Sequence, residues 1–344
     1  MDITERKTAN RYFAFDIMRI IAACMVAAIH VYNPNSEIVG FLFNDTIARV
    51  AVPFFFACSG FFGASRDRKA LIKYLRRISL IYLIWSAAYF PIVLSLDKFR
   101  YEESLIQTIV RYSRLLLDYG ISGHLWYFPA LIFAVLLVYF LQKKLSDGVI
   151  LIISFVFYFL ALFGEPYYSL LPVGGFTQKV YSYYFEIFKS VRNGLFFGFF
   201  FLSIGVYLRN KMVMPKKRAV FGLVVSTVLL VAESAILEYA IQPKDRNIMI
   251  SLLPLTIFLI SYLRTFDLKP RDIYLHCGRC GTIIYGVHVM AMYYGTIAIR
   301  RMGSDIDAYP ILVYLLTVIL SIAIYALVYN LSKIRFFKWL EVLY

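Results

Sequence analysis

The sequence predicts an all-α, polytopic membrane helix bundle of about ten transmembrane helices, with the N- and C-termini cytoplasmic. Three observations lead to this prediction. The 344 residues are 61% hydrophobic and 17% charged, whereas a soluble domain has roughly 45–50% apolar and about 25% charged residues. Apolar runs long enough to span a bilayer recur along the chain. Lysine and arginine gather in alternate connections between these runs.

The apolar runs are expected to form helices, because unpaired backbone groups cannot be left in hydrocarbon. They lie at residues 13–33, 45–63, 78–96, 124–141, 149–163, 186–208, 219–240, 247–263, 281–299 and 310–331. With the N-terminus inside, the inner connections carry more than twice as many basic residues as the outer ones, which sets the predicted orientation. No internal repeat or linker divides the chain, so residues 1–344 are expected to form a single membrane domain.

The formal net charge of +15 does not by itself indicate nucleic acid. In so apolar a chain, basic residues are first a topology signal and only second a sign of an anionic ligand. The lipid bilayer is the expected partner. Cys277 and Cys280 have the spacing of a metal or redox pair, but only His276 is nearby as a third ligand, so no metal is expected.

The first apolar run carries three polar residues, Asp16, Arg19 and His30. On an ideal helix Arg19 and His30 point within about 20° of each other, and Asp16 lies about 60° away. His30 lies roughly 16 Å beyond Arg19 along the helix axis. All three are therefore expected on one face. Asp16 and Arg19 also make a discarded signal peptide a poor explanation of this run.

Two interpretations of this face remain open. In the first, Asp16 and Arg19 neutralise each other near the interface and His30 is simply packed at the outer end. In the second, His30 acts as a general base, since its reference pKa near 6.5 suits removal of a hydroxyl proton. Arg19 would then hold or orient an anionic group.

Several short motifs along the chain resemble one known family. The stretch from Phe15 to Ala22 followed by His30 resembles the first-helix signature of the acyltransferase 3 family of membrane acyltransferases. Further matching pieces, in the same order and spacing, are Pro53-Phe54-Phe55-Phe56 with Ser59-Gly60-Phe61-Phe62, His124-Leu125-Trp126-Tyr127-Phe128, Arg192-Asn193-Gly194-Leu195-Phe196 and Tyr285-Gly286-Val287-His288. Residues 124–130 and 192–196 also resemble the membrane domain of vancomycin-resistance serine racemases, of the same superfamily.

The resemblance implies an O-acyltransferase in the bacterial cytoplasmic membrane. It would take an acyl group, commonly acetyl, from cytoplasmic acyl-CoA and pass it to a hydroxyl of an envelope carbohydrate or lipid-linked sugar. It also implies that His30 and Arg19 are required, and we group Asp16 with them as catalytic candidates. The donor is acetyl-CoA or another acyl-CoA, and no metal cofactor is expected.

The densest basic segment lies in the predicted inner loop after the second run. Its candidate residues for binding the phosphates of CoA are Arg66, Arg68, Lys73, Arg76 and Arg77. Arginine forks and lysine point charges suit phosphate. Anchoring against anionic lipid is the alternative, and both can hold. The family tends to have Arg-x-x-Arg here, whereas this chain has Lys73-Tyr74-Leu75-Arg76-Arg77, which weakens the assignment of individual roles.

The candidates for the acceptor side come from three later runs. They are His124, Trp126, Arg192, Tyr285 and His288. The alternatives are an interfacial aromatic belt for Trp126, an ion-pair cluster with Glu186 and Lys189 for Arg192, and a buried structural histidine for His288. His276 is expected to be an ordinary residue of a basic loop.

A transporter or permease for a small metabolite such as an amino acid is the alternative function. It would use the same intramembrane polar residues to couple to its substrate. Against it stand the missing inverted repeat and the absence of paired broken helices at matching positions.

Overall fold

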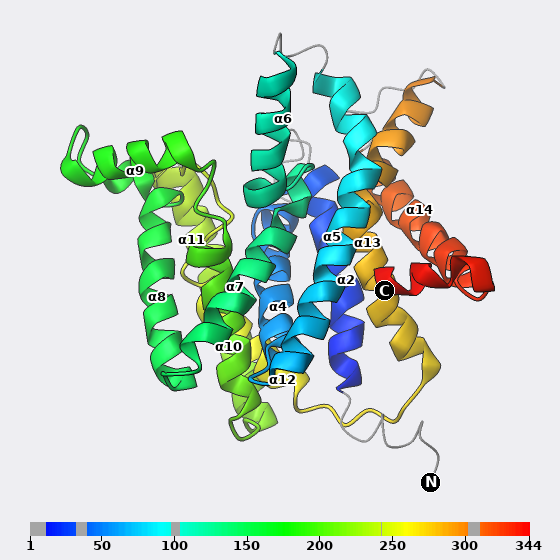
Figure 1. Cartoon of the computed structure of the whole chain (residues 1–344). Coiled ribbons are helices and arrows are strands. Elements are labelled where there is room, and N and C mark those ends of the chain that lie inside the picture. Colours follow the sequence, from blue (N-terminus) through cyan, green and yellow to red (C-terminus); the bar gives the residue numbers. More distant parts are fainter. Residues whose placement is uncertain (1–11, 32–39, 98–103, 242, 302–309) are drawn as a thin grey trace. The chain divides into compact units, whose positions relative to one another are not determined.

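The computed structural model describes residues 12–31, 40–97, 104–241, 243–301 and 310–344 of the chain. Every regular element within these residues is helical (Figure 1). The helices of the described part that are long and apolar enough to cross a membrane are Phe13–Val31, Gly40–Gly63, Arg68–Asp97, Gly123–Leu141, Asp147–Gly164, Lys216–Ile241, Asp272–Arg301 and Pro310–Leu331. Two shorter apolar helices are Gly194–Arg209 and Leu252–Leu263. The predicted polytopic helical bundle is confirmed, and the side on which the termini lie stays a prediction.

The sixth predicted run is wrong at its start. Its first two residues belong to α9 (Phe176–Ile187), and the apolar helix begins only with η7 (Gly194–Gly198), which continues as α10 (Phe199–Arg209). Asn193 fixes this start, because its side-chain oxygen accepts hydrogen bonds from the backbone amides of Leu195 and Phe196 at 3.0 and 3.1 Å. Glu186 and Lys189 therefore lie outside the spanning helix to which they were assigned.

Contacts within the chain group it into two compact units. The first comprises residues 1–55, 212–228 and 254–344, and the second comprises residues 56–211 and 229–253. The single membrane domain over residues 1–344 stays a prediction.

The first unit is built around α2 (Phe13–Val31), which packs against α13 (Asp272–Arg301) and α14 (Pro310–Leu331). The other elements of this unit are η1 (Gly40–Asn44), η2 (Ile47–Val50), η10 (Arg335–Leu343) and parts of α4 (Ala51–Cys58), α11 (Lys216–Ile236) and α12 (Leu252–Leu263). Ala22, Ala23 and Ala27 of α2 are fully buried. Such small side chains let neighbouring helix backbones approach closely. In a bilayer this close packing stabilises helix association, because the hydrophobic effect does not drive it there.

The second unit is centred on α10, which contacts both α7 (Tyr127–Leu141) and α8 (Asp147–Gly164). Its other elements are η3 (Ser59–Gly63), α5 (Arg68–Asp97), α6 (Leu105–Arg114), η4 (Leu115–Tyr119), η5 (Gly123–Trp126), η6 (Tyr168–Leu170), α9, η7 and η8 (Leu237–Ile241), with parts of α4, α11 and α12. Gly60 of η3 lies against the backbone of Leu202, and Gly205 of α10 lies against the backbone of Ala57. These glycines let α10 approach α4 and η3 closely within the second unit.

Candidate functional site

The polar face predicted on the first helix is present. α2 is helical throughout, and the carboxylate of Asp16 accepts a hydrogen bond from Nη1 of Arg19 at 3.0 Å. The Asp16 side chain is 4% exposed and that of Arg19 30% exposed. His30, in the last turn of α2, is exposed. Asp16 and Arg19 are thus joined as an ion pair, whereas His30 lies about 16 Å further along the helix.

Two glycines of α13 shape the surroundings of this ion pair. A Cβ atom at Gly278 would collide with the carboxylate of Asp16, and one at Gly281 would lie 2.8 Å from the backbone carbonyl of Arg19. The side chain of Asp16 is therefore confined by α13 from one side while it holds Arg19 from the other. Only glycine, which has no Cβ atom, permits this packing at residues 278 and 281.

Gly281→Ala is expected to lower the thermal stability of the purified protein in detergent. The new methyl group would meet backbone atoms of Arg19, so only a shift of a helix can relieve the contact. Overpacking of this kind typically costs about 1–3 kcal/mol. Gly295→Ala is the matched control on the same helix, since its Cβ would lie 3.6 Å from Leu320 Cδ1, an ordinary contact. Equal melting temperatures for the two variants, measured by tryptophan fluorescence, would contradict this packing.

The C-terminal end of α2 lies beside a second pair, made by two histidines. The ring centroids of His30 and His288 are 5.1 Å apart, with an angle of 39° between the planes. His288 is fully buried on α13. Its Nδ1 lies 3.1 Å from the carbonyl oxygen of Ile284 and 2.9 Å from that of Tyr285. The structure therefore places the predicted residue His288 beside His30, and the ring centroid of the predicted Tyr285 lies 6.1 Å from that of His288.

The predicted CoA-binding residues lie in the second unit, at the start of α5 and just before it. All of them are exposed: Arg66, Arg68, Lys73, Arg76 and Arg77. Arg66 forms an ion pair with Asp147 at 3.1 Å. The side chain of Asp67 accepts a hydrogen bond from the amide of Ala70 at 2.7 Å and so caps the first turn of α5. The amide of Ala70 is thus already hydrogen-bonded and cannot serve phosphate. Phosphate binding here would depend mainly on the exposed basic side chains.

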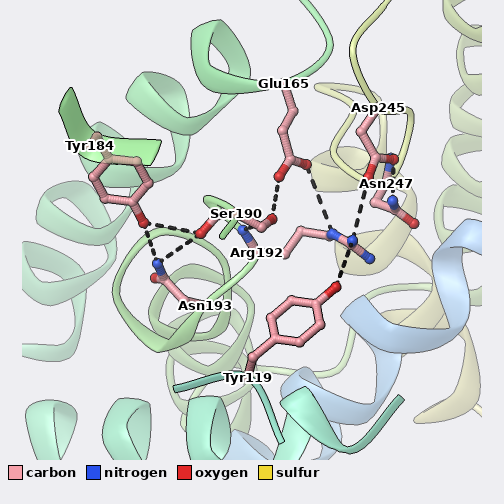
Figure 2. A network of polar contacts seen from close by, with 8 residues as sticks. All are labelled: Tyr119, Glu165, Tyr184, Ser190, Arg192, Asn193, Asp245 and Asn247. Carbon is pink, nitrogen blue, oxygen red and sulfur yellow. Dashed lines mark hydrogen bonds and ion pairs between the residues drawn. The ribbon is translucent and has the colours of Figure 1, made fainter. Parts of the chain in front are cut away.

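Arg192 lies in the second unit at the centre of a polar network (Figure 2). Its Nη2 lies 3.4 Å from a carboxylate oxygen of Asp245 and donates to the hydroxyl of Tyr119 at 3.5 Å. Its Nε lies 3.9 Å from a carboxylate oxygen of Glu165. The predicted ion-pair alternative for Arg192 is therefore correct in kind but names the wrong partner. Glu186 lies on α9, whereas Glu165 follows the end of α8 and Asp245 lies in the connection between η8 and α12.

The connection between α9 and η7 positions Arg192. The hydroxyl of Ser190 donates to Glu165, and the amide of Arg192 donates to the same hydroxyl oxygen at 2.9 Å (Figure 2). Tyr184 donates to the carbonyl of Ser190 at 3.0 Å, and Asn193 donates to the Tyr184 hydroxyl at 2.7 Å. These bonds hold an otherwise irregular segment in one conformation.

The network places two carboxylates beside Arg192, and the charge of Lys244 also interacts with both of them. The Glu165 side chain is 4% exposed, that of Arg192 20% and that of Asp245 30%. Burial raises the pKa of Glu165 above its usual value although Arg192 opposes the change. Burial alone would lower the pKa of Arg192, but Asp245 and Glu165 outweigh it. The two carboxylates therefore keep Arg192 charged, whereas burial makes Glu165 easier to protonate.

The predicted His124 and Trp126 share the short helix η5 in the same unit. The guanidinium of Arg192 lies 5.8 Å from the centroid of the Trp126 ring, within the range of a cation–π contact. His124 is buried, its Nδ1 is 3.2 Å from the hydroxyl of Ser122, and the Tyr89 ring packs edge-on against it at 4.8 Å. Of the acceptor-side candidates, Arg192 and Trp126 therefore contact each other.

Sequence reasoning did not find the carboxylates around Arg192, or the partners of Glu233. Glu233 accepts hydrogen bonds from the hydroxyl of Tyr167 at 2.5 Å and from the amides of Ile250 and Ser251 at 2.8 Å each. Glu165 stands at the end of an apolar run, where an acidic side chain needs a partner, and this was the available signal. Its partner, Arg192, could not be predicted because it is distant from Glu165 in the sequence.

His276 is placed in the first turns of α13 rather than in a loop. Its Nδ1 lies 2.5 Å from the hydroxyl of Tyr325 on α14. Cys277 and Cys280 are free thiols. In the described part of the chain no group of three or more histidine, cysteine or acidic residues is arranged to hold a metal ion.

The fold and these sites define a multi-pass membrane protein with histidine, arginine and carboxylate groups on its spanning helices. The sequence profile described as "Acyltransferase domain" matches residues 12–330. The chain therefore belongs to the acyltransferase 3 family of membrane acyltransferases.

The similar proteins with curated descriptions are racemases. An amino-acid racemase of Enterococcus faecalis is 30% identical over 266 residues, which cover 76% of this chain and 37% of that protein. A serine/alanine racemase of Enterococcus gallinarum is 30% identical over 291 residues, covering 79% of this chain and 40% of that protein. The chain thus spans about two fifths of the length of these relatives. No solved structure matches it.

Proposed function

We propose that this protein is an acyl-CoA-dependent O-acyltransferase of the bacterial cytoplasmic membrane. It transfers an acyl group, most simply acetyl, from cytoplasmic acyl-CoA to a hydroxyl of an envelope carbohydrate or lipid-linked sugar. Membership of the acyltransferase 3 family supports the reaction type. The donor, the acceptor and the membrane are our proposals.

The observation that carries this proposal is the placement of His30. It is exposed at the end of α2, and the ring of His288 lies 5.1 Å away. An accessible imidazole suits general-base removal of a hydroxyl proton at neutral pH. The resulting alkoxide would attack the thioester carbon, forming the new C–O bond and breaking the C–S bond. The proton held by His30 would then pass to the leaving thiolate of CoA.

Arg19 has a different role in this proposal. It lies about 16 Å from His30 along α2. Arg19 is therefore too far away to contact the reacting carbonyl while His30 contacts the acceptor hydroxyl. Binding of the donor therefore fits Arg19 better than stabilisation of the oxyanion that forms on the thioester carbonyl. Asp16, at 3.0 Å from Arg19, would hold the guanidinium in place.

Arg19→Gln is accordingly expected to weaken donor use more than it slows the chemical step. The KM for acetyl-CoA should rise by about tenfold, since a hydrogen bond to a charged group is worth about 1.5–3 kcal/mol, while kcat falls less. Steady-state kinetics of the purified protein would measure both constants. Asp16→Asn should change KM in the same direction but less, because it leaves the guanidinium in place. A fall in kcat at constant KM would contradict the donor-binding role.

The exposed basic segment from Arg66 to Arg77 is the proposed docking place for the phosphates of CoA. Salt should weaken this step, because exposed charge pairs are screened beyond about 10 Å at 0.1 M ionic strength. The cluster around Arg192 and Trp126 is proposed for the acceptor. The ring of Trp126 is buried, so it would support the site from below, and the partly exposed Arg192 and Asp245 would offer hydrogen-bonding groups for the hydroxyls of the sugar.

The testing experiment uses purified protein in proteoliposomes of defined orientation. Radiolabelled acetyl-CoA is supplied on one side at a time, with extracted envelope carbohydrate on the other. Labelled carbohydrate formed only when acetyl-CoA meets the face that carries Arg66 to Arg77 is the expected result. Failure to bind CoA, measured by calorimetry on the same protein, would reject the proposal.

A second candidate is an amino-acid permease or the membrane part of a system that handles amino acids. The names of the relatives favour it, because they are racemases of amino acids. Uptake of radiolabelled serine into the same proteoliposomes, without CoA, would support it. Acyl transfer without serine uptake would leave the acyltransferase as the better assignment.

A further inference from the structure

The short helix η10 (Arg335–Leu343) carries three rows of side chains with different surroundings. It has three residues per turn, so side chains three positions apart lie in line. In one row Leu340 and Leu343 are buried. In the second row Phe336 and Trp339 are 80% and 55% exposed. The third row is charged and exposed, and consists of Arg335, Lys338 and Glu341. One packed, one apolar and one charged row suit a helix that lies where protein, lipid and water meet.

Contacts within the first unit hold η10 in this orientation. η10, red in Figure 1, turns back from the end of α14. The ring of Tyr344, directly after η10, lies 5.3 Å from the guanidinium of Arg279 on α13. The Tyr344 hydroxyl lies 2.6 Å from that of Ser332, which follows α14, and its ring packs edge-on against Tyr325 of α14 at 6.3 Å. The aromatic row is therefore directed outward by contacts of the protein itself.

The exposed apolar surface of α14 continues into η10. α14 is long and apolar enough to cross a membrane, and its Leu315, Ile319 and Leu327 are 49%, 59% and 58% exposed. Exposed apolar side chains on a spanning helix mark the surface that faces lipid. Only residues 332–334 separate α14 from η10, and among them Ile334 is 52% exposed. The aromatic row of η10 therefore lies where the lipid-facing surface of α14 reaches the headgroups, a depth at which aromatic side chains are enriched.

The charges of this segment favour one class of lipid. Lys333, Arg335 and Lys338 are opposed by one acidic residue, Glu341. The ammonium group of Lys333 donates to the side chain of Asn330 at 3.1 Å, so Arg335 and Lys338 are the better candidates for binding a headgroup. Basic residues clustered directly beside a spanning helix attract anionic lipid.

We propose that η10 is a docking surface for anionic phospholipid. Phe336 and Trp339 lie among the acyl chains close to the headgroups, and Arg335 and Lys338 pair with the phosphate of an anionic headgroup. Helices at the membrane surface bind through buried apolar area together with attraction to anionic lipid, and η10 offers both. This inference does not depend on the proposed acyl transfer.

Tryptophan fluorescence tests the insertion, with the wild-type protein in lipid nanodiscs, where both faces of the bilayer are accessible. Trp85 and Trp126 are buried and Trp339 is exposed, so subtraction of the emission of Trp339→Phe isolates the signal of Trp339. Phospholipid brominated close to the headgroup end of its acyl chains should quench this signal strongly, and iodide in the water should quench it weakly. Quenching by iodide alone would place Trp339 in water, and shielding from both quenchers would place it against protein. Either result overturns the proposal.

The same signal tests the choice of headgroup. Brominated phosphatidylglycerol, at a low fraction in phosphatidylcholine, should quench Trp339 several-fold more than brominated phosphatidylcholine at the same fraction. The variant Arg335→Gln with Lys338→Gln should lose this preference. Lys269→Gln with Arg271→Gln is the matched control, since it removes two exposed charges from the connection before α13, and it should keep the preference. Equal quenching by the two lipids in the wild type, or the same preference in both double variants, would overturn the assignment of the anionic headgroup to Arg335 and Lys338.

Discussion

Replacement of His30 by alanine is expected to reduce acyl transfer by about 10²- to 10⁴-fold, the usual contribution of a general base. The loss should appear in kcat, because His30 acts on the acceptor proton and the proposed donor contacts lie elsewhere. The residue is exposed, so its removal leaves no buried cavity. Exposed substitutions typically change stability by no more than about 0.5 kcal/mol. The melting temperature of the variant in detergent should therefore stay close to that of the wild type.

His276→Gln provides the matched control for a lost imidazole. It lies on α13 in the same unit, and glutamine can still form a hydrogen bond to the hydroxyl of Tyr325, which His276 meets at 2.5 Å. Its transfer rate should equal that of the wild type. Transfer by His30→Ala at the wild-type rate, with acetyl-CoA saturating, would remove His30 from the mechanism and with it the observation on which the proposed function depends.

Much of the fold can be predicted from the sequence, because a bilayer imposes one length and one composition on every spanning helix. Each predicted run is present as an apolar helix among the described residues. The error at the sixth run is instructive. The apolar residues around Ile187 and Phe188 continue the hydropathy pattern, but Asn193 caps a new helix at Gly194. A side-chain cap decides where a helix starts, and average hydropathy does not detect it.

In the site, contacts within one helix could be predicted from the sequence, whereas contacts between two helices could not. The ion pair of Asp16 and Arg19 follows from their spacing on one helix and is observed. The approach of His288 to His30 depends on how α13 packs against α2, which glycines such as Gly278 and Gly281 determine. Helix spacing gives the face on which a residue lies, but it does not give the residue that faces it from another helix.

Replacement of Arg192 by methionine is expected to destabilise the protein by about 3 kcal/mol. This is near the lower end of the usual cost of removing one partner from a buried ion pair, about 3–5 kcal/mol. We choose the lower end because the closest carboxylate contact of Arg192 is 3.4 Å. Methionine keeps much of the side-chain volume, so the loss should report the charge and not a cavity. Thermal unfolding in detergent measures it.

The double variant Arg192→Met with Glu165→Gln is the control for this interpretation. If the cost arises from leaving the carboxylate of Glu165 buried beside an apolar side chain, the neutral amide should recover a large part of it, and the two substitutions should be non-additive. Additive losses would show that Arg192 stabilises the protein in another way, for example through its contact with Trp126 at 5.8 Å.

The stability of Arg192→Met should also depend on pH more steeply than that of the wild type. Burial already raises the pKa of Glu165 above its usual value of 4.5, and loss of the neighbouring guanidinium would raise it further. A carboxyl with a raised pKa in the folded state stabilises the protein at low pH, and this stabilisation is lost as pH rises from 4.5 through the raised value. The melting temperature of Arg192→Met should therefore fall further between pH 5 and pH 8 than that of the wild type. In the double variant, which lacks the titrating carboxyl, this additional fall should disappear, and its persistence would assign the pH dependence to another group.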